Sequence, residues 1–209
     1  MITSIPDPVV KRLPMYYRYL KELENEGISF ISSVELGKRM DLNASQIRQD
    51  ANAFGGEGRQ GYGYPVPAMR RHLEKLLGID QQRTMIIVGA GNMGAALLHY
   101  RFDCIGFSVI GAFDSNPQKT GEPIGSAQVQ SADDMEAFLE SNHVDIAVLT
   151  VPARTAQETA ERIYRCGVRG FWNFAPVNLQ LPRDVSIVDV HLDDSLELLS
   201  YWLSHPAEW

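Results

Sequence analysis

Cysteine is scarce in this chain, and long apolar runs are missing from its sequence. The 209 residues include two cysteines, Cys104 and Cys166, which lie far apart and form no CxxC or metal-ligand spacing. This usage is typical of a reducing compartment and predicts packing roles for both thiols, with a thiol switch as the alternative. No apolar run approaches the roughly eighteen residues of a membrane-spanning helix, and no charged-then-apolar leader opens the chain. We therefore expect a soluble, cytoplasmic protein with no membrane partner.

Charge is distributed unevenly along the chain. The net charge is −7. Residues 1–78 contain 11 Lys and Arg and 9 Asp and Glu, whereas the remaining residues contain 8 Lys and Arg and 17 Asp and Glu. The acidic part would repel nucleic acid, whereas the mildly basic part can hold it if its cations share one face. The asymmetry predicts two domains with different partners.

The N-terminal residues follow the helical period. Gly27 ends a first helix with apolar residues at three- and four-residue spacings: Val10, Leu13, Tyr17, Leu20 and Leu23. Ser32 and Glu35 form a capping box that starts a second helix, and a third is predicted from about Ala44 to Phe54. Helix, tight turn and helix are the plan of a DNA-binding motif. The last helix of this motif carries the candidate DNA contacts: Ser45, Gln46, Arg48, Gln49 and Asn52.

A glycine-rich stretch, GGEGRQGYGYPV, follows the third helix. Glycine tolerates the positive φ of tight hairpin turns, so the stretch suits a wing whose tip offers Arg59 to a DNA groove. A hinge loop between domains fits the spacing equally well. A further helix over residues 65–78 ends at Gly78, and the change of pattern near 79–83 predicts a domain boundary.

Strands and helices alternate from Thr84 onward. Strands are predicted over 84–89, 107–113, 144–150, 169–173 and 185–190, and helices over 92–102, 131–141, 153–166 and 194–204. The strand sequences, such as TMIIVG and VDIAVLTV, are almost continuously apolar. This pattern is typical of a parallel sheet covered on both faces and predicts an α/β fold.

Gly89, Gly91 and Gly94 form a GxGxxG motif between a strand and a helix. The first glycine permits the tight turn, the second lets the backbone approach a pyrophosphate, and the third lets helix and strand pack closely. Asp114 lies 20 residues after Gly94, where a carboxylate binds a ribose diol and repels a 2′-phosphate. The spacing predicts NAD(H) rather than NADP(H). The other candidate cofactor contacts lie in the same turn and in two strand-end loops: Ala90, Asn92, Met93, Thr150, Val151, Pro152, Asn173 and Phe174.

Catalytic groups are sparse beside this predicted cofactor. A hydride-transfer enzyme needs a general acid or base near the nicotinamide. No Tyr-x-x-x-Lys pair or metal-ligand spacing appears, and none of the histidines lies in a strand-end loop that flanks the nicotinamide: His72, His99, His143, His191 and His205. We therefore expect no catalytic residues and no metal site, with an NAD-dependent oxidoreductase as the alternative.

Taken together, these motifs resemble those of the Rex redox-sensing transcriptional repressors over nearly the whole chain. The matching segments are RLPMYYRYLKELENEG, SSVELG, FGGEGRQGYGY, VGAGNMG, AFDSNP, TVPA, NFAPV and LSYWL. The resemblance implies a winged-helix domain over 1–80, a Rossmann-type parallel-sheet domain that binds NAD(H) over 81–190, and a C-terminal helix over 191–209 that is swapped in a homodimer. An ordinary last helix on its own sheet is the alternative. The resemblance also implies repression at palindromic double-stranded operator DNA, with NADH favouring release.

The chain departs from this family pattern in its DNA-binding part. Gln49 and Gln60 stand where the family has basic residues, and Ala51-Asn52-Ala53 replaces a Leu/Phe-Ser-Tyr segment. Each lost phosphate contact would lower affinity for DNA. A Rex-like nucleotide-binding protein with altered or lost operator binding is therefore the alternative function.

A further departure concerns the redox switch that the resemblance implies. The family couples an arginine of the first helix and a tyrosine after the glycine-turn helix to an aspartate before the swapped helix. Arg18 and Tyr100 match the first two, but His191 holds the aspartate position. A protonated histidine would repel Arg18, so we expect a response to NADH that is weakened, shifted or pH-dependent.

Overall fold

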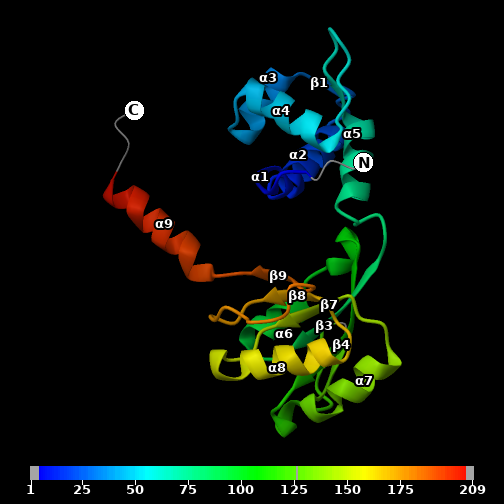
Figure 1. The fold of residues 1–209 in the computed structure, drawn as a ribbon, viewed down its shortest axis with the longest axis vertical. Coiled ribbons are helices and arrows are strands. Elements are labelled where there is room, and N and C mark those ends of the chain that lie inside the picture. Colours follow the sequence, from blue (N-terminus) through cyan, green and yellow to red (C-terminus); the bar gives the residue numbers. More distant parts are fainter. Residues whose placement is uncertain (1–4, 126, 206–209) are drawn as a thin grey trace. The chain divides into compact units, whose positions relative to one another are not determined.

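The computed structural model describes residues 5–125 and 127–205, and the chain divides into two compact units, Met1–Gln81 and Gln82–Trp209. The first unit is a bundle of short helices with a two-stranded ribbon (Figure 1). Its elements are α1 (Asp7–Val10), α2 (Leu13–Asn25), β1 (Phe30–Ile31), α3 (Ser33–Met40), α4 (Ala44–Phe54), β2 (Tyr64–Pro65) and α5 (Val66–Leu76). The first helix of the prediction is thus two helices, because Pro14 favours a new helix start in the first turn of α2.

The α3–turn–α4 segment confirms the predicted helix-turn-helix. Ser32 Oγ accepts a hydrogen bond from the Glu35 amide at 3.1 Å, and Asn43 Oδ1 accepts one from the Gln46 amide at 2.8 Å, so each helix begins with a side-chain cap. The turn between them packs closely on Gly37 of α3, where a Cβ would lie 2.4 Å from the Leu42 carbonyl oxygen. Glycine is therefore required there for the two helices to meet.

The glycine-rich stretch forms a wing rather than a hinge. Strands β1 and β2 pair antiparallel, and an isolated bridge joins Arg59 to Gly63 beyond them. Gly61 and Gly63 have φ values of +81° and +85°, which residues other than glycine rarely adopt. This hairpin confirms the winged-helix class.

A buried carboxylate ties the start of the chain to α4. Asp50 is fully buried and accepts hydrogen bonds from Arg12 Nε and Nη2, both at 2.7 Å, from Tyr16 Oη at 2.9 Å, and from Gln46 Nε2 at 2.8 Å. Burial alone would raise the pKa of this carboxyl, but these donors outweigh it and hold the pKa below its ordinary value of 3.8. The carboxylate is therefore charged and fully paired at neutral pH.

The second unit is built around a seven-stranded sheet in the order β5-β6-β4-β3-β7-β8-β9. All neighbours pair parallel except β5 with β6. Numbered along the chain, the six parallel strands follow the 3-2-1-4-5-6 order of a Rossmann fold. The strands are β3 (Arg83–Val88), β4 (Phe107–Asp114), β5 (Pro123–Ile124), β6 (Ala127–Ser131), β7 (Ile146–Leu149), β8 (Gly170–Asn173) and β9 (Ser186–Asp189).

Helices cover the two faces of this sheet unequally. α7 and α8 cover one face with Met135, Leu139, Ala156, Ala160 and Ile163. α6 and η1 cover part of the other with Leu98 and Phe102. The helical segments of the unit are α6 (Asn92–Leu98), η1 (Phe102–Ile105), η2 (Pro117–Lys119), η3 (Ala132–Asp134), α7 (Met135–Ser141), α8 (Ala153–Arg165) and α9 (Leu192–Ser204).

Two predictions for this unit are wrong in detail. Strand β6 was not expected, because its sequence AQVQS is too polar to be recognised as a strand covered on both faces. The helix predicted over 92–102 ends at Leu98, where Gly125 packs so closely that a Cβ there would lie 2.0 Å from the Leu98 carbonyl oxygen. The chain then continues as η1.

Part of the sheet is left open to solvent, as is all of α9. A groove of about 480 Å³ on the sheet, which we call the open face, is bordered by Met85, Phe102, Ile105, Phe107, Ile146, Phe171, Trp172 and Val188. Every residue of α9 is exposed, although leucines recur along it at helical spacing: Leu192, Leu196, Leu199 and Leu203. An amphipathic helix that buries nothing lacks its packing partner.

We expect Arg12→Met to destabilise the first unit by about 2–4 kcal/mol at pH 7, because a buried carboxylate loses its bidentate partner while water reaches part of the site. Since folding lowers the pKa of Asp50, the stabilisation is present above the unfolded pKa and is lost as the pH falls through the folded one. The difference between parent and variant should therefore shrink below about pH 4. Hydrogen exchange of the α4 amides, corrected for intrinsic exchange rates, measures this difference in the free energy of unfolding.

Arg39→Met is the matched control, because Arg39 pairs with Glu26 at the surface. This variant should leave exchange in α4 unchanged. Equal protection of α4 in Arg12→Met and the parent would contradict the role given to the buried pair.

Candidate cofactor pocket and nucleic-acid interface

The glycine turn follows β3, which pairs parallel with β7 at the centre of the sheet. The chain leaves β3 toward β4 on one side and leaves β7 toward β8 on the other, so this is the switch point of the strand order. Gly89 has a φ of +102°, and a Cβ there would lie 2.8 Å from the carbonyl group of Thr150. Thr150 Oγ1 donates to the Gly89 carbonyl at 2.6 Å. At Gly94 a Cβ would lie 1.8 Å from that same carbonyl oxygen. Both glycines are therefore required by the packing of the unit itself.

Gly91 is different, because nothing in the fold requires it. Its φ is −67°, which any residue adopts, and a Cβ there would meet no atom within 4 Å. Gly91 lines a cavity of about 630 Å³ at the carboxyl ends of the strands, where such sheets bind ligands. The space beside it fits a group that approaches the backbone closely, as a pyrophosphate does.

Seven of the predicted cofactor contacts line this cavity: Gly89, Gly91, Asp114, Thr150, Val151, Pro152 and Phe174. Ala90, Asn92, Met93 and Gly94 belong to the same turn but are not among the lining residues. The other lining residues were not predicted from the sequence. They come from β3, the segments after β4 and β8, η3, α7 and α8: Val88, Ser115, Lys119, Ala132, Met135, Thr155, Glu158, Thr159, Arg162 and Pro176. Those on α8 recur at helical spacing and so share one face, the single signal that sequence could have offered.

Asp114 stands at the end of β4 as predicted. Its Oδ2 accepts a hydrogen bond from the Ala90 amide at 2.7 Å, and its Oδ1 accepts one from the Asn116 amide at 2.8 Å. The carboxylate thus joins the glycine turn to the loop after β4. Its Oδ1 retains a lone pair that a ribose hydroxyl can use.

Asn173 has an internal rather than a lining role. It is fully buried; its Nδ2 donates to the Val177 carbonyl and to Asp189 Oδ1, each at 2.8 Å, and its Oδ1 accepts from the Ala175 amide at 3.0 Å. The side chain shapes the loop that presents Phe174 to the cavity.

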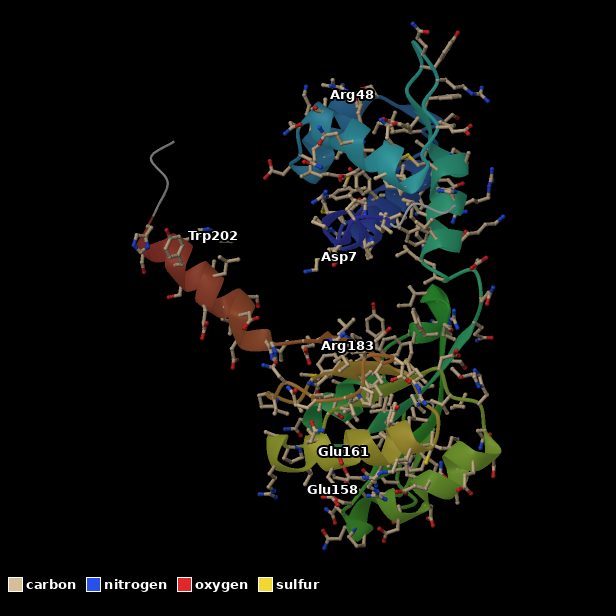
Figure 2. The ribbon with its side chains drawn as sticks, viewed as in Figure 1. Asp7, Arg48, Glu158, Glu161, Arg183 and Trp202 are labelled. Atoms are coloured by element: carbon tan, nitrogen blue, oxygen red, sulfur yellow. The ribbon has the colours of Figure 1, made fainter. Side chains whose placement is uncertain are left out.

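The outer face of α4 carries four of the five DNA contacts predicted on this helix. Ser45, Arg48, Gln49 and Asn52 are exposed, and Arg48 is labelled in Figure 2. Arg48 Nη1 donates to Ser33 Oγ at 3.1 Å, which links α4 to the start of α3. Gln46 lies at the flank of the helix, where its amide nitrogen is bound to Asp50.

In the wing, Arg59 lies at the stem and Gln60 at the turn. The Arg59 guanidinium lies 5.7 Å from the ring centre of Phe30 on β1. The turn residues that follow, Gln60 to Tyr62, are exposed, and the side chain of Tyr62 is 73% exposed. The wing thus offers a polar amide and an aromatic ring at its end.

The three predicted switch residues are all exposed. Arg18 lies on α2 with its guanidinium 5.3 Å from the ring centre of Tyr19. Tyr100 follows α6, with its ring centre 4.7 Å from that of Phe102 and the two rings tilted by 50°, and His191 is the residue that precedes α9. The first belongs to one unit and the other two to the second.

The side chains of the described residues offer no metal site, and their helices offer no membrane span. Within residues 5–125 and 127–205, no three His, Cys, Asp or Glu side chains gather as a metal site would require. None of the described helices has the length and apolar character needed to cross a membrane. Burial raises the pKa of the Cys166 thiol, which disfavours its reactive thiolate.

Two family models match the chain in the same arrangement as its two units. The one described as "Putative DNA-binding protein N-terminus" matches residues 4–52, and the one described as "CoA binding domain" matches residues 80–177.

Relatives that match over nearly the full length of the chain identify its family more specifically than these two models do. The redox-sensing transcriptional repressor Rex of Caldanaerobacter subterraneus subsp. tengcongensis is 46% identical over 97% of this chain and 91% of its own length. The Rex of Clostridium botulinum is 43% identical over 96% of each protein. Among solved structures, RSP in complex with β-NAD+ and operator DNA matches with a TM-score of 0.92 and 45% identity, over 97% of this chain and 94% of that one. RSP in complex with β-NADH matches with a TM-score of 0.88 and 42% identity, over 97% and 95%.

Gly91→Ala should leave the fold intact and weaken dinucleotide binding. Its Cβ enters open space, so we expect the melting temperature to stay within about 2 °C of the parent. The affinity for NADH, measured by isothermal titration calorimetry, should fall at least about tenfold, because the methyl group occupies the path of the pyrophosphate.

Gly94→Ala serves as the contrast, because its Cβ would collide with the Gly89 carbonyl and lower the melting temperature itself. Unchanged NADH affinity in Gly91→Ala would show that the dinucleotide does not pass this turn.

Proposed function

The chain belongs to the Rex family of redox-sensing transcriptional repressors, and we propose that it binds operator DNA and releases it when NADH is bound. The observation that carries the proposal is one chain holding both a helix-turn-helix with an exposed α4 and a dinucleotide cavity at the switch point of a Rossmann sheet. Here the dinucleotide is a signal rather than a reagent, as befits a family of regulators rather than enzymes. A DNA-bound regulator of this kind acts in the cytoplasm.

The cavity residues fit NAD(H) in separate roles. Asp114 binds the ribose of the adenosine half, and Gly91 leaves room for the pyrophosphate. The loops that contain Thr150 and Phe174 flank the nicotinamide end. When bound, the cofactor supplies only its oxidation state, which the protein reads through differential affinity for the two forms.

In the proposed complex, α4 enters the major groove and the wing lies against the adjacent groove. Ser45, Arg48, Gln49 and Asn52 face the bases and phosphates, while the buried Asp50 network holds Gln46 and the helix in place. Gln60 and Arg59 contribute from the wing. The neutral Gln49 and Gln60 supply no ionic phosphate contact, so a basic variant at either position would bind DNA more tightly.

The working form is a homodimer in which α9 of each copy packs on the partner. The leucine stripe of α9 is exposed to between 48% and 75%, and the open face of the sheet exposes Ile105 and Val188. Covering two apolar surfaces with each other removes both from water. The same two-fold symmetry presents two α4 helices to a palindromic operator.

The switch joins Arg18 and Tyr100 to the segment before α9 of the partner. Asp189 cannot substitute freely for a carboxylate at position 191, because its Oδ1 already accepts from Asn173. Asp193, in the first turn of α9, remains beside His191. A protonated histidine at position 191 would repel Arg18, whereas a carboxylate would attract it, so this switch responds to pH as well as to NADH.

Fluorescence anisotropy with a palindromic Rex-type operator duplex at fixed salt tests the proposal. The apo and NAD+ forms should bind, and NADH should lower the affinity by about tenfold or more, the range of an ordinary allosteric coupling. Absence of binding in every state would replace the proposal by its alternative, a Rex-like nucleotide-binding protein with altered or lost operator binding. Gln49, Gln60 and Ala51-Asn52-Ala53 would then be the first positions to restore.

The same titrations at pH 6 and pH 8 test the switch. The NADH effect should differ between the two values in the parent and should become constant in His191→Asp. An identical cofactor response in both proteins across this range would contradict the role of His191.

Leu199→Asp should convert the dimer to a monomer, because a carboxylate in the α9 contact loses its hydration without gaining a partner. Sedimentation velocity measures the change in mass. Asp194→Asn alters the polar side of the same helix and should remain a dimer. A dimeric Leu199→Asp would show that α9 does not form the subunit contact.

A further inference from the structure

We propose that Lys119 is a further cofactor-binding residue, which sets the affinity for the adenosine half of NAD(H) and leaves the preference between NADH and NAD+ unchanged. The inference deepens the proposed function and relies on it only in taking NAD(H) as the ligand of the cavity. It assigns a role to the only lysine in the sequence beyond Lys75.

Lys119 is held at the glycine turn by its own ammonium group. Lys119 Nζ donates to the Ala90 carbonyl at 2.7 Å and lies 3.5 Å from Asp114 Oδ2. Its side chain is 29% exposed and lines the cavity, so the charge is neither buried in the core nor free in solvent. It stands at the corner where the carboxylate of β4 meets the turn after β3.

A short, well-bonded turn directs the lysine back toward this corner. Asp114 Oδ1 accepts from the Asn116 amide, Asn116 Oδ1 accepts from the Gln118 amide at 3.0 Å, and the Asn116 carbonyl accepts from the Lys119 amide at 3.0 Å. The turn η2 is therefore built on the same carboxylate that the ammonium approaches. The backbone at Lys119 is thus held in place by the hydrogen bonds that start at Asp114, and the ammonium group is directed toward that carboxylate.

The chemistry of this corner suits the adenosine side of a dinucleotide. A lysine ammonium has three N–H donors, of which one is used by Ala90 and one faces Asp114. The third is available to a ribose hydroxyl or a phosphate oxygen. The positive charge also offsets the repulsion between Asp114 and the anionic pyrophosphate, which the carboxylate alone would create.

A contact at this end does not distinguish the two oxidation states. NADH and NAD+ differ only at the nicotinamide ring, whereas Lys119 stands beside the ribose carboxylate. A contact with the shared half contributes the same binding free energy to both forms, and it therefore cancels from their affinity ratio. Lys119 determines how much cofactor is needed, and other residues determine which form is read.

Isothermal titration calorimetry of the full-length protein with ADP-ribose, NAD+ and NADH tests the inference. Lys119→Met should weaken all three ligands by about tenfold, the effect expected for a lost charge-assisted hydrogen bond, and the ratio of NADH to NAD+ affinity should stay within about twofold of the parent. Lys119→Arg should recover most of the affinity because it keeps the charge. Arg183→Met is the matched control, since Arg183 is an exposed cation of the same unit outside the cavity lining (Figure 2).

Two results would overturn the inference. ADP-ribose affinity in Lys119→Met within twofold of the parent would remove Lys119 from the binding site. A shift of more than about threefold in the NADH to NAD+ ratio would place it in the sensing of oxidation state. Because ADP-ribose binding needs no operator, failure of the parent to release DNA with NADH would count against the proposed function alone.

Discussion

The cofactor pocket depends on how closely three backbone segments approach one another: the end of β3, the end of β7 and the first turn of α6. Thr150 bonds the Gly89 carbonyl, and Gly94 packs against that same carbonyl with no room for a Cβ. Because this contact fixes the turn, Ala90 can offer its amide to Asp114 and its carbonyl to Lys119. The pocket is therefore prepared by packing that takes place beneath it, and the ligand has little backbone to reorganise.

The first unit depends in the same way on a polar group in its interior. Asp50 holds α4 by accepting hydrogen bonds from Arg12 at the break between α1 and α2, from Tyr16 of α2 and from Gln46 of its own helix. A buried carboxylate with all its partners adds little stability over an apolar core, but it allows only one arrangement of the helices. Fixing the angle of α4 matters more here than stability, because α4 is the helix proposed to enter the DNA groove.

The features that could be predicted from the sequence are those encoded by short-range patterns. The caps of α3, the parallel strands and the GxGxxG turn with Asp114 all rest on residues a few positions apart or on one apolar period. Lys119 could not be predicted as a pocket residue, because a lysine in a loop belongs to no periodic sequence pattern. Asn173 was expected to face the ligand, because a polar residue at the end of a strand is usually exposed, but its side chain is buried beneath the loop. Asp50 reads as a solvated helix residue until Arg12, 38 positions away, is placed beside it.

The uncovered leucine stripe of α9 has a consequence for the life of a newly made chain. Every residue of α9 is exposed in the single chain, so in the proposed dimer this helix stays open to solvent until another copy arrives. Assembly is then second order in protein, and at low copy number the exposed interval lengthens. Slow synthesis would leave α9 of the unpaired chain open to proteolysis. In the proposed dimer, the helix that forms the subunit contact therefore also sets a lower limit on the protein concentration at which the regulator persists.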